Sequence, residues 1–217
     1  MTEHRPPREI LRYNANERTN HWLVAISFVL AGLSGLALYH PAMSWLYALF
    51  GGGPWTRILH PFIGVFMFVV FFLFAARMWG SNRIDARDRQ WLRQIDDVAA
   101  GREDKLPEVG RYNAGQKLLF WGIMGLITLL LISGVVIWRP YFAPLFSIPT
   151  IRIGLFVHAL AGVLLMLLII GHIYLAFWVK GSVDSMSTGY VSRKWARTHH
   201  PRWYRQVTGD SARKERP

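Results

Sequence analysis

The 217-residue sequence contains no cysteine, and none of its aspartates or glutamates lies within a long apolar run. Without cysteine, the chain can neither ligate an iron–sulfur cluster nor form a disulfide bond. Without acidic residues in the apolar runs, it lacks the carboxylates that zinc sites and ion transporters usually use. We recognise no internal repeat and no low-complexity tract. Any site chemistry inside the apolar runs must therefore depend on other polar side chains.

Apolar residues make up 52% of the chain and gather in four long runs. The runs are long enough for membrane-spanning helices, and the first exceeds the apolar core of a cleaved signal peptide. Short connections within the first and the second pair of runs favour antiparallel neighbours. The sequence therefore predicts an all-α, integral membrane four-helix bundle that forms one domain over residues 1–217, with a tail at 180–217. The predicted spans lie at about 22–39, 61–79, 118–138 and 153–179.

Positive charge is strongly uneven along the chain, whose formal net charge is +12. Of the 25 lysines and arginines, all but Arg57, Arg139 and Arg152 lie in the two tails or between Arg77, at the end of the second span, and Lys117. This asymmetry predicts that both termini and that connection are cytoplasmic. Membrane topology accounts for the positive charge of the chain. We therefore expect the lipid bilayer as a partner, and no nucleic acid.

The cytoplasmic connection contains the segment DARDRQWLRQIDDVAAG at 85–101. Its apolar residues Trp91, Leu92, Ile95 and Val98 recur at helical spacing. We expect a short helix that lies on the membrane surface and could offer a docking face to a partner.

The fourth run carries only two strongly polar side chains, His158 and His172. Their spacing is close to four helical turns, so they point the same way at heights about 21 Å apart. One histidine in a span could simply bond a neighbouring helix, but two on one stripe favour an inward-facing site. The predicted topology places His60 at the outer level with His158, and His21 towards the cytoplasm with His172, the second match being approximate.

Two imidazoles from facing helices, repeated at two depths, suit the axial ligation of haem iron in a bundle core. The second ring nitrogen of each ligand would then need an acceptor such as a backbone carbonyl. Gly35, Gly162 and Gly171 could let a flat ring approach the helices, although close helix packing explains these glycines equally well.

Several segments are similar to one family. The chain resembles the cytochrome b (gamma) subunit of bacterial membrane-bound respiratory formate dehydrogenases over nearly its whole length. The segments that carry this resemblance are RTNHW (18–22), RILHPFIG (57–64), KLPEVGRYNAGQKLLFW (105–121), GVVIWRPYFA (134–143), HIYLAFWVKGS (172–182) and VSRKWARTHHPRWYR (191–205).

The resemblance implies two b-type haems, held by His60 and His158 on the periplasmic side and by His21 and His172 on the cytoplasmic side. It also implies a quinone, such as menaquinone, reduced near the cytoplasmic haem at Asn113, Gly115, Gln116 and His172. The residues alone favour a different interpretation of that segment, in which Asn113 caps the third span and Lys117 lies at the lipid headgroups.

The function implied is electron transfer to quinone in anaerobic respiration at the bacterial inner membrane, by a subunit with no substrate chemistry of its own. Its partners would be an iron–sulfur beta subunit and a catalytic alpha subunit, in a complex that could form a higher oligomer. Two alternatives stay open. The same cytochrome could serve a hydrogenase or another quinone-linked oxidoreductase, or the chain could be a His-lined transporter or membrane anchor without haem.

Overall fold

The computed structural model describes residues 9–102 and 105–209, which form two compact units. The four-helix unit consists of Thr19–Arg77 and Trp121–Tyr174. The terminal unit consists of the described parts of Met1–Arg18, Met78–Phe120 and Leu175–Pro217. The last eight residues of the predicted tail lie outside the described residues.

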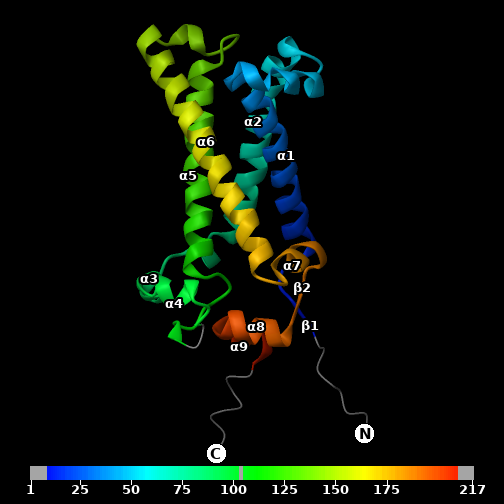
Figure 1. Cartoon of the computed structure of the whole chain (residues 1–217), viewed down its shortest axis with the longest axis vertical. Coiled ribbons are helices and arrows are strands. Elements are labelled where there is room, and N and C mark those ends of the chain that lie inside the picture. Colours follow the sequence, from blue (N-terminus) through cyan, green and yellow to red (C-terminus); the bar gives the residue numbers. More distant parts are fainter. Residues whose placement is uncertain (1–8, 103–104, 210–217) are drawn as a thin grey trace, which may run out of the picture. The chain divides into compact units, whose positions relative to one another are not determined.

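Four long helices dominate the chain (Figure 1). They are rich in Leu, Ile, Val and Phe, and in lipid such segments become helical because every backbone group must bond within its own segment. By length and composition each could cross a membrane, so the chain is a multi-pass membrane protein and the predicted fold class is confirmed. These helices are α1 (Ala15–Tyr39), α2 (Gly53–Met78), α5 (Ala114–Ile137) and α6 (Ile148–Trp178).

Each long helix begins several residues before the apolar run that predicted it. The first turns of these helices are polar or contain glycine and proline, so they do not belong to the apolar run. The residues at which each helix enters and leaves the lipid stay predictions from the sequence. The description of the chain as one domain also stays a prediction. Helix α2 contains Pro61, directly after His60. Proline has no N–H to donate to the carbonyl of Arg57, so this turn of the helix is locally weakened.

The connections within each helix pair are short. A 3₁₀ helix, η1 (Pro41–Phe50), links α1 to α2, and η4 (Ala143–Leu145) lies between α5 and α6. His40 begins η1 by accepting the N–H of Ala42 at its Nδ1 atom. Gly51 ends η1 at φ 81°, a conformation that glycine adopts without a steric penalty.

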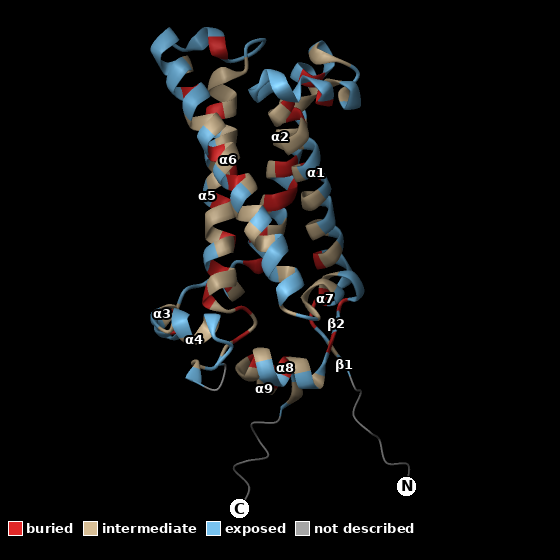
Figure 2. Cartoon of the chain, in the orientation of Figure 1, coloured by how far each residue is buried: buried red, intermediate tan, exposed pale blue. Residues whose placement is uncertain are grey.

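The long helices of the four-helix unit carry many exposed residues, drawn pale blue in Figure 2, and large apolar side chains are among them. Leu73, Ile132, Leu167 and Ile170 are between 58% and 62% exposed. A continuous apolar surface of this kind is unfavourable in water but matches the hydrocarbon of a bilayer.

The terminal unit contains short helices and a small antiparallel pair of strands, in which Ile10 faces Val191. Its core is formed by Val191, Ala196, Trp203 and Tyr204. The elements of the unit are η2 (Gly80–Asn82), α3 (Ala86–Arg93), α4 (Ile95–Ala99), α7 (Ser182–Thr188), α8 (Arg193–His199), α9 (Pro201–Thr208), β1 (Glu9–Leu11) and β2 (Tyr190–Ser192).

The predicted helix in the cytoplasmic connection is present as α3 and α4. Asp85 and Asp88 form a capping box at the start of α3, each side chain accepting a backbone N–H of the other. Trp91, however, is buried at 8% exposure and packs beside Gly115. It stabilises the terminal unit and is not available to a membrane surface.

Our statement that the sequence has no internal repeat is wrong. The segment RYNANER at 12–18 recurs as RYNAGQK at 111–117, with a spacing of 99 residues. The first arginines of the two copies bond each other reciprocally: Arg12 Nη2 donates to the carbonyl of Arg111 at 3.1 Å, and Arg111 Nη2 donates to that of Arg12 at 3.0 Å. Other residues recur at the same spacing or one position closer. These pairs are Trp22 and Trp121, Ser34 and Ser133, Gly35 and Gly134, His60 and His158, and Gly64 and Gly162.

Candidate functional site

His60 of α2 and His158 of α6 face each other inside the four-helix unit. Their ring centroids are 6.1 Å apart and the ring planes are inclined by 79°. A metal–imidazole bond is about 2 Å long, so two rings that bind one metal from opposite sides have centroids roughly 6 Å apart. The structure thus brings this predicted pair together at a separation that one iron between them would require.

Each of these two rings is held by a serine on the neighbouring helix. Ser34 Oγ of α1 lies 2.9 Å from His60 Nδ1, and Ser133 Oγ of α5 lies 3.0 Å from His158 Nδ1. A serine hydroxyl has one hydrogen, and both serines lie within bonding distance of carbonyls in their own helices. The hydroxyl therefore donates to the carbonyl and accepts from the ring. Nδ1 then carries the proton, and Nε2 keeps the lone pair that a metal needs.

A glycine follows each serine and makes room for the imidazole. A Cβ atom on Gly35 would lie 3.3 Å from His60 Cε1, and one on Gly134 would lie 3.2 Å from His158 Cε1. Both distances are tighter than ordinary van der Waals contact. Sequence analysis singled out Gly35, but it missed Ser34, Ser133 and Gly134. The recurrence of a Ser-Gly pair about 25 residues before each histidine was the signal that could have found them.

His21 of α1 and His172 of α6 form the second pair in the same unit. Their ring centroids are 6.3 Å apart, with the planes inclined by 58°. Trp22 and Phe74 pack edge-on against the His21 ring. The Nδ1 atom of His21 is buried and bonds no atom of the described residues. This nitrogen therefore lacks, within the described residues, the serine contact that each ring of the first pair makes.

The two pairs suit a group that brings most of its own ligands. Within residues 9–102 and 105–209, no three His, Asp or Glu side chains lie close enough to hold a metal ion together. A bare ion such as zinc needs three or four protein ligands, whereas haem iron has four porphyrin nitrogens and takes only two axial groups. Two neutral imidazoles on facing helices therefore fit haem better than a bare metal ion.

The four remaining site predictions divide between the units. Asn113, Gly115 and Gln116 belong to the terminal unit, and His172 belongs to the four-helix unit. The backbone N–H of Asn113 donates to Gln116 Oε1 at 3.0 Å, and that of Gln116 donates to Asn113 Oδ1 at 2.9 Å. This reciprocal capping box starts α5 and uses only the two amide oxygens. Asn14 and Glu17 form the same box at the start of α1.

Gly115 lies beside both the cap and α3. A Cβ atom there would lie 3.4 Å from Asn113 Oδ1 and 3.5 Å from Trp91 Cη2, which is ordinary van der Waals contact. Packing of Trp91 therefore does not by itself require a glycine at this position. Asn113 also borders a shallow, open depression that Asp85 and Arg202 help to line.

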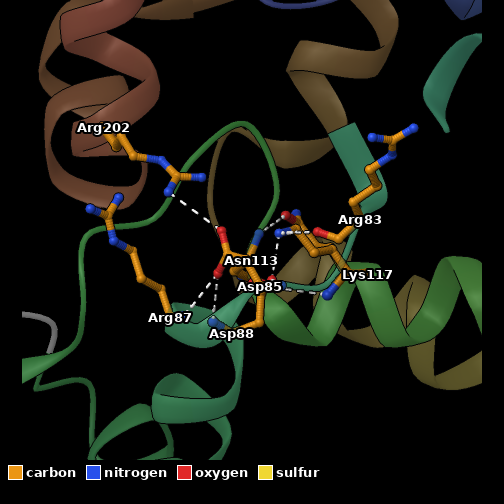
Figure 3. Close-up of polar contacts among 8 residues, drawn as sticks. Arg83, Asp85, Arg87, Asp88, Asn113, Lys117 and Arg202 are labelled. Carbon is orange, nitrogen blue, oxygen red and sulfur yellow. Dashed lines mark hydrogen bonds and ion pairs between the residues drawn. The ribbon is translucent and has the colours of Figure 1, made fainter. Parts of the chain in front are cut away.

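Lys117 lies in the terminal unit in a place that the sequence analysis did not anticipate. We considered it a headgroup contact, but its side chain is only 5% exposed. Its Nζ donates to Asp88 at 2.6 Å and to the carbonyl of Arg83 at 2.9 Å, as Figure 3 shows. The headgroup interpretation of Lys117 is wrong, because the lysine joins α3 to the start of α5.

Comparison with known proteins gives a consistent result. A family model for prokaryotic cytochrome b561 matches residues 12–189. The chain is 47% identical to the cytochrome b556(Fdn) subunit of nitrate-inducible formate dehydrogenase from Escherichia coli (strain K12), over 95% of both chains. It is also 47% identical to the cytochrome b556(fdo) subunit from the same strain, over 94% of this chain and 96% of that one. A formate dehydrogenase cytochrome b556 subunit from Haemophilus influenzae is 38% identical over 91% of this chain. The resemblance noted in the sequence is confirmed.

Proposed function

The chain belongs to the prokaryotic cytochrome b561 family, and we propose that it is the dihaem cytochrome b subunit of a bacterial formate dehydrogenase. In this proposal it passes electrons from a periplasmic iron–sulfur subunit through two bis-histidine haems to a quinone on the cytoplasmic side. The observation that carries the proposal is the pair of facing imidazoles, with ring centroids 6.1 and 6.3 Å apart, at two sites in one unit.

His60 and His158 would hold the periplasmic-side haem, and His21 and His172 the cytoplasmic-side haem. When bound, such a group supplies reversible one-electron transfer. The chain offers neutral ring nitrogens, fixes two of the rings through Ser34 and Ser133, and surrounds them with apolar helices that exclude water. These are the tasks by which a protein tunes haem chemistry.

Other subunits must supply the substrate chemistry. The sequence has no cysteine, so an iron–sulfur chain would lie in a beta subunit and the formate site in an alpha subunit. The names of the relatives, which are subunits of formate dehydrogenases, support this division of labour. The complex would lie in the bacterial inner membrane, with both termini of this chain in the cytoplasm.

We place quinone reduction at Asn113, Gly115, Gln116 and His172, with menaquinone as the acceptor in anaerobic respiration. The support is the family resemblance together with the amide nitrogens of Asn113 and Gln116, which take no part in the capping box. Because the capping box occupies only their oxygens, each NH₂ group can still donate to a quinone carbonyl or to a water that carries protons.

A reduced-minus-oxidised spectrum of the purified complex, with a haem assay, tests the main proposal. We expect a b-type band and two haems per chain, and we expect His158→Ala to remove one haem and leave the other. His40→Ala is the matched control, since His40 caps η1 and should not affect either haem. Absence of a b-type band from the unmodified complex would overturn the proposal. Copurification with a hydrogenase subunit would assign the same cytochrome to the alternative complex.

A further inference from the structure

We propose that Ser34 and Ser133 are positioning residues that lower the reduction potential of the His60–His158 site relative to the His21–His172 site. This inference rests on the proposed function, because it assumes that each histidine pair binds haem. It goes further by naming residues that would give electron transfer between the two sites a preferred direction.

The argument begins with the direction of the serine hydroxyls. Ser34 Oγ lies 2.8 Å from the carbonyl oxygen of Leu30, and Ser133 Oγ lies 2.6 Å from that of Leu129. Because each hydroxyl spends its only hydrogen on a carbonyl, its lone pairs face the nearby Nδ1 atom. Each ring must then donate from Nδ1, which fixes its tautomer and its rotation about the Cβ–Cγ bond.

A ring that donates from Nδ1 is a stronger metal ligand at Nε2. Partial removal of the Nδ1 proton raises the electron density of the imidazole and its basicity. A more basic ligand favours ferric over ferrous iron, so the reduction potential falls. Burial strengthens the effect, since Ser34 is 0% exposed and Ser133 is 4% exposed, and hydrogen bonds are stronger where water is excluded.

In the second pair, the Nδ1 atom of His21 is buried with no hydrogen-bond partner among the described residues. This pair also has no counterpart in the repeat, because the positions equivalent to His21 and His172 in the other copy are occupied by Phe120 and Phe74. The His60–His158 pair, by contrast, receives matching serine contacts from both copies. Its haem should therefore have the lower potential, which favours electron flow from the outer to the inner site.

A simpler explanation is that the serines only satisfy carbonyls of their own helices, as hydroxyls in membrane helices often do. Other hydroxyls in the unit do this, and two of them, those of Ser27 and Thr128, provide matched controls. Ser27 lies about two helical turns before Ser34, and its Oγ donates to the carbonyl of Leu23 at 2.7 Å. Thr128 Oγ1 donates to the carbonyl of Met124 at 2.8 Å, before Ser133. Among the described residues, no hydrogen bond joins either hydroxyl to a haem-site histidine.

The test is a redox titration of the purified complex, monitored by the b-type band and by the electron paramagnetic resonance of the ferric haems. We expect Ser34→Ala and Ser133→Ala each to raise the potential of the component that His158→Ala removes, and the double variant to raise it further. Ser34→Thr keeps a hydroxyl and should retain the native potential. Ser27→Ala and Thr128→Val should leave both components unchanged.

The resonance signal adds an independent readout, because it depends on the angle between the imidazole planes, which is 79° at this site. Unchanged potential and signal in haem-loaded Ser34→Ala and Ser133→Ala variants would overturn the inference while leaving the dihaem proposal intact. If an alanine variant loses haem, Ser34→Cys decides the question. Its weaker acceptor should give a smaller upward shift, and a native potential in Ser34→Cys would count against the inference.

Discussion

At the scale of single residues, His200 is a buried histidine that the protein keeps neutral. Its Nδ1–H donates to the carbonyl of Gly110 at 2.8 Å, and its Nε2 accepts from Arg12 Nη2 at 3.1 Å. Trp195 packs against the ring. Burial, together with the Arg12 guanidinium beside it, lowers the pKa of His200 to about 3. A proton on Nε2 would displace the arginine and bring two cations together.

This histidine makes the terminal unit sensitive to acid. The folded-state pKa of His200 is depressed, so its contribution to stability is complete above the unfolded pKa of about 6.5 and declines as pH falls towards about 3. Between pH 7 and pH 5 we expect a loss of about 2 kcal/mol from this group. His200→Asn retains a donor and an acceptor but does not titrate. Thermal unfolding at the two pH values should therefore show a smaller acid destabilisation in the variant, and an equal one would contradict this assignment.

The buried ion pair between Lys117 and Asp88 gives a second prediction. Lys117→Met should destabilise the terminal unit by about 3–5 kcal/mol, because it leaves a buried carboxylate without its partner. Adding Asp88→Asn should recover much of the loss, since the amide oxygen can still accept the N–H of Asp85. Arg102→Ala breaks an exposed pair and should cost less than about 1 kcal/mol. Chemical denaturation monitored by tryptophan fluorescence would rank the three.

At the scale of secondary-structure elements, α1 and α5 start with the same capping box. The box that holds Asn113 and Gln116 has its counterpart in Asn14 and Glu17, so capping alone explains why asparagine occurs at both positions. A role in quinone binding must be additional to this structural one, and the two can be separated by experiment.

Asn113→Asp and Asn113→Ala make that separation. Aspartate caps helices as well as asparagine does, whereas alanine should cost about 1 kcal/mol of stability. If the amide NH₂ contacts quinone, Asn113→Asp should keep native thermal stability and raise the KM for quinone. Asn14→Ala provides the matched cap-only control, with reduced stability and an unchanged KM. A native KM in Asn113→Asp would remove this residue from the quinone proposal.

The sequence predicted these elements unequally. The four spanning helices were evident because their apolar runs exceed any soluble element, yet their polar first turns, such as Ala15–His21, carry no such signal. The short helices α8 and α9 were missed because they are rich in charge and depend on contacts of Trp203 and Tyr204. The strands β1 and β2 pair residues at opposite ends of the chain, which no local pattern reveals.

The candidate site was predictable to a similar degree. Membrane topology sorted the four histidines into the two pairs that now face each other, because depth follows directly from span direction. We expected backbone carbonyls as acceptors, and the carbonyls of Ala31 and Leu130 do bond His60 and His158. The two serines were missed, because each lies about 25 residues from its histidine and only the recurrence of the Ser-Gly pair points to them. Lys117 was misplaced because its partner Asp88 lies 29 positions earlier, beyond any local pattern.

At the scale of the whole molecule, topology is the prediction that matters most, because it determines which histidine pair faces the electron donor. A reporter enzyme that works only in the cytoplasm should be active when it is fused after residue 217. It should also be active when it is inserted at Gly101, between α4 and α5. Fusions in the connections at Gly52 and Phe142 should show the periplasmic phenotype. A periplasmic signal from the C-terminal fusion would reverse the assignment of donor and acceptor sides.

The reciprocal bonds between Arg12 and Arg111 are of the kind that a two-fold symmetric pair of identical halves would make. Two identical copies of one half, arranged like the two halves here, would already oppose His60 to a second His60 and so possess the first histidine pair. They could not make the second, since His21 and His172 come from non-equivalent positions whose counterparts are Phe120 and Phe74. A symmetric pair of half-proteins could therefore form one histidine pair for electron transfer. Two different pairs in series require the halves to differ in sequence.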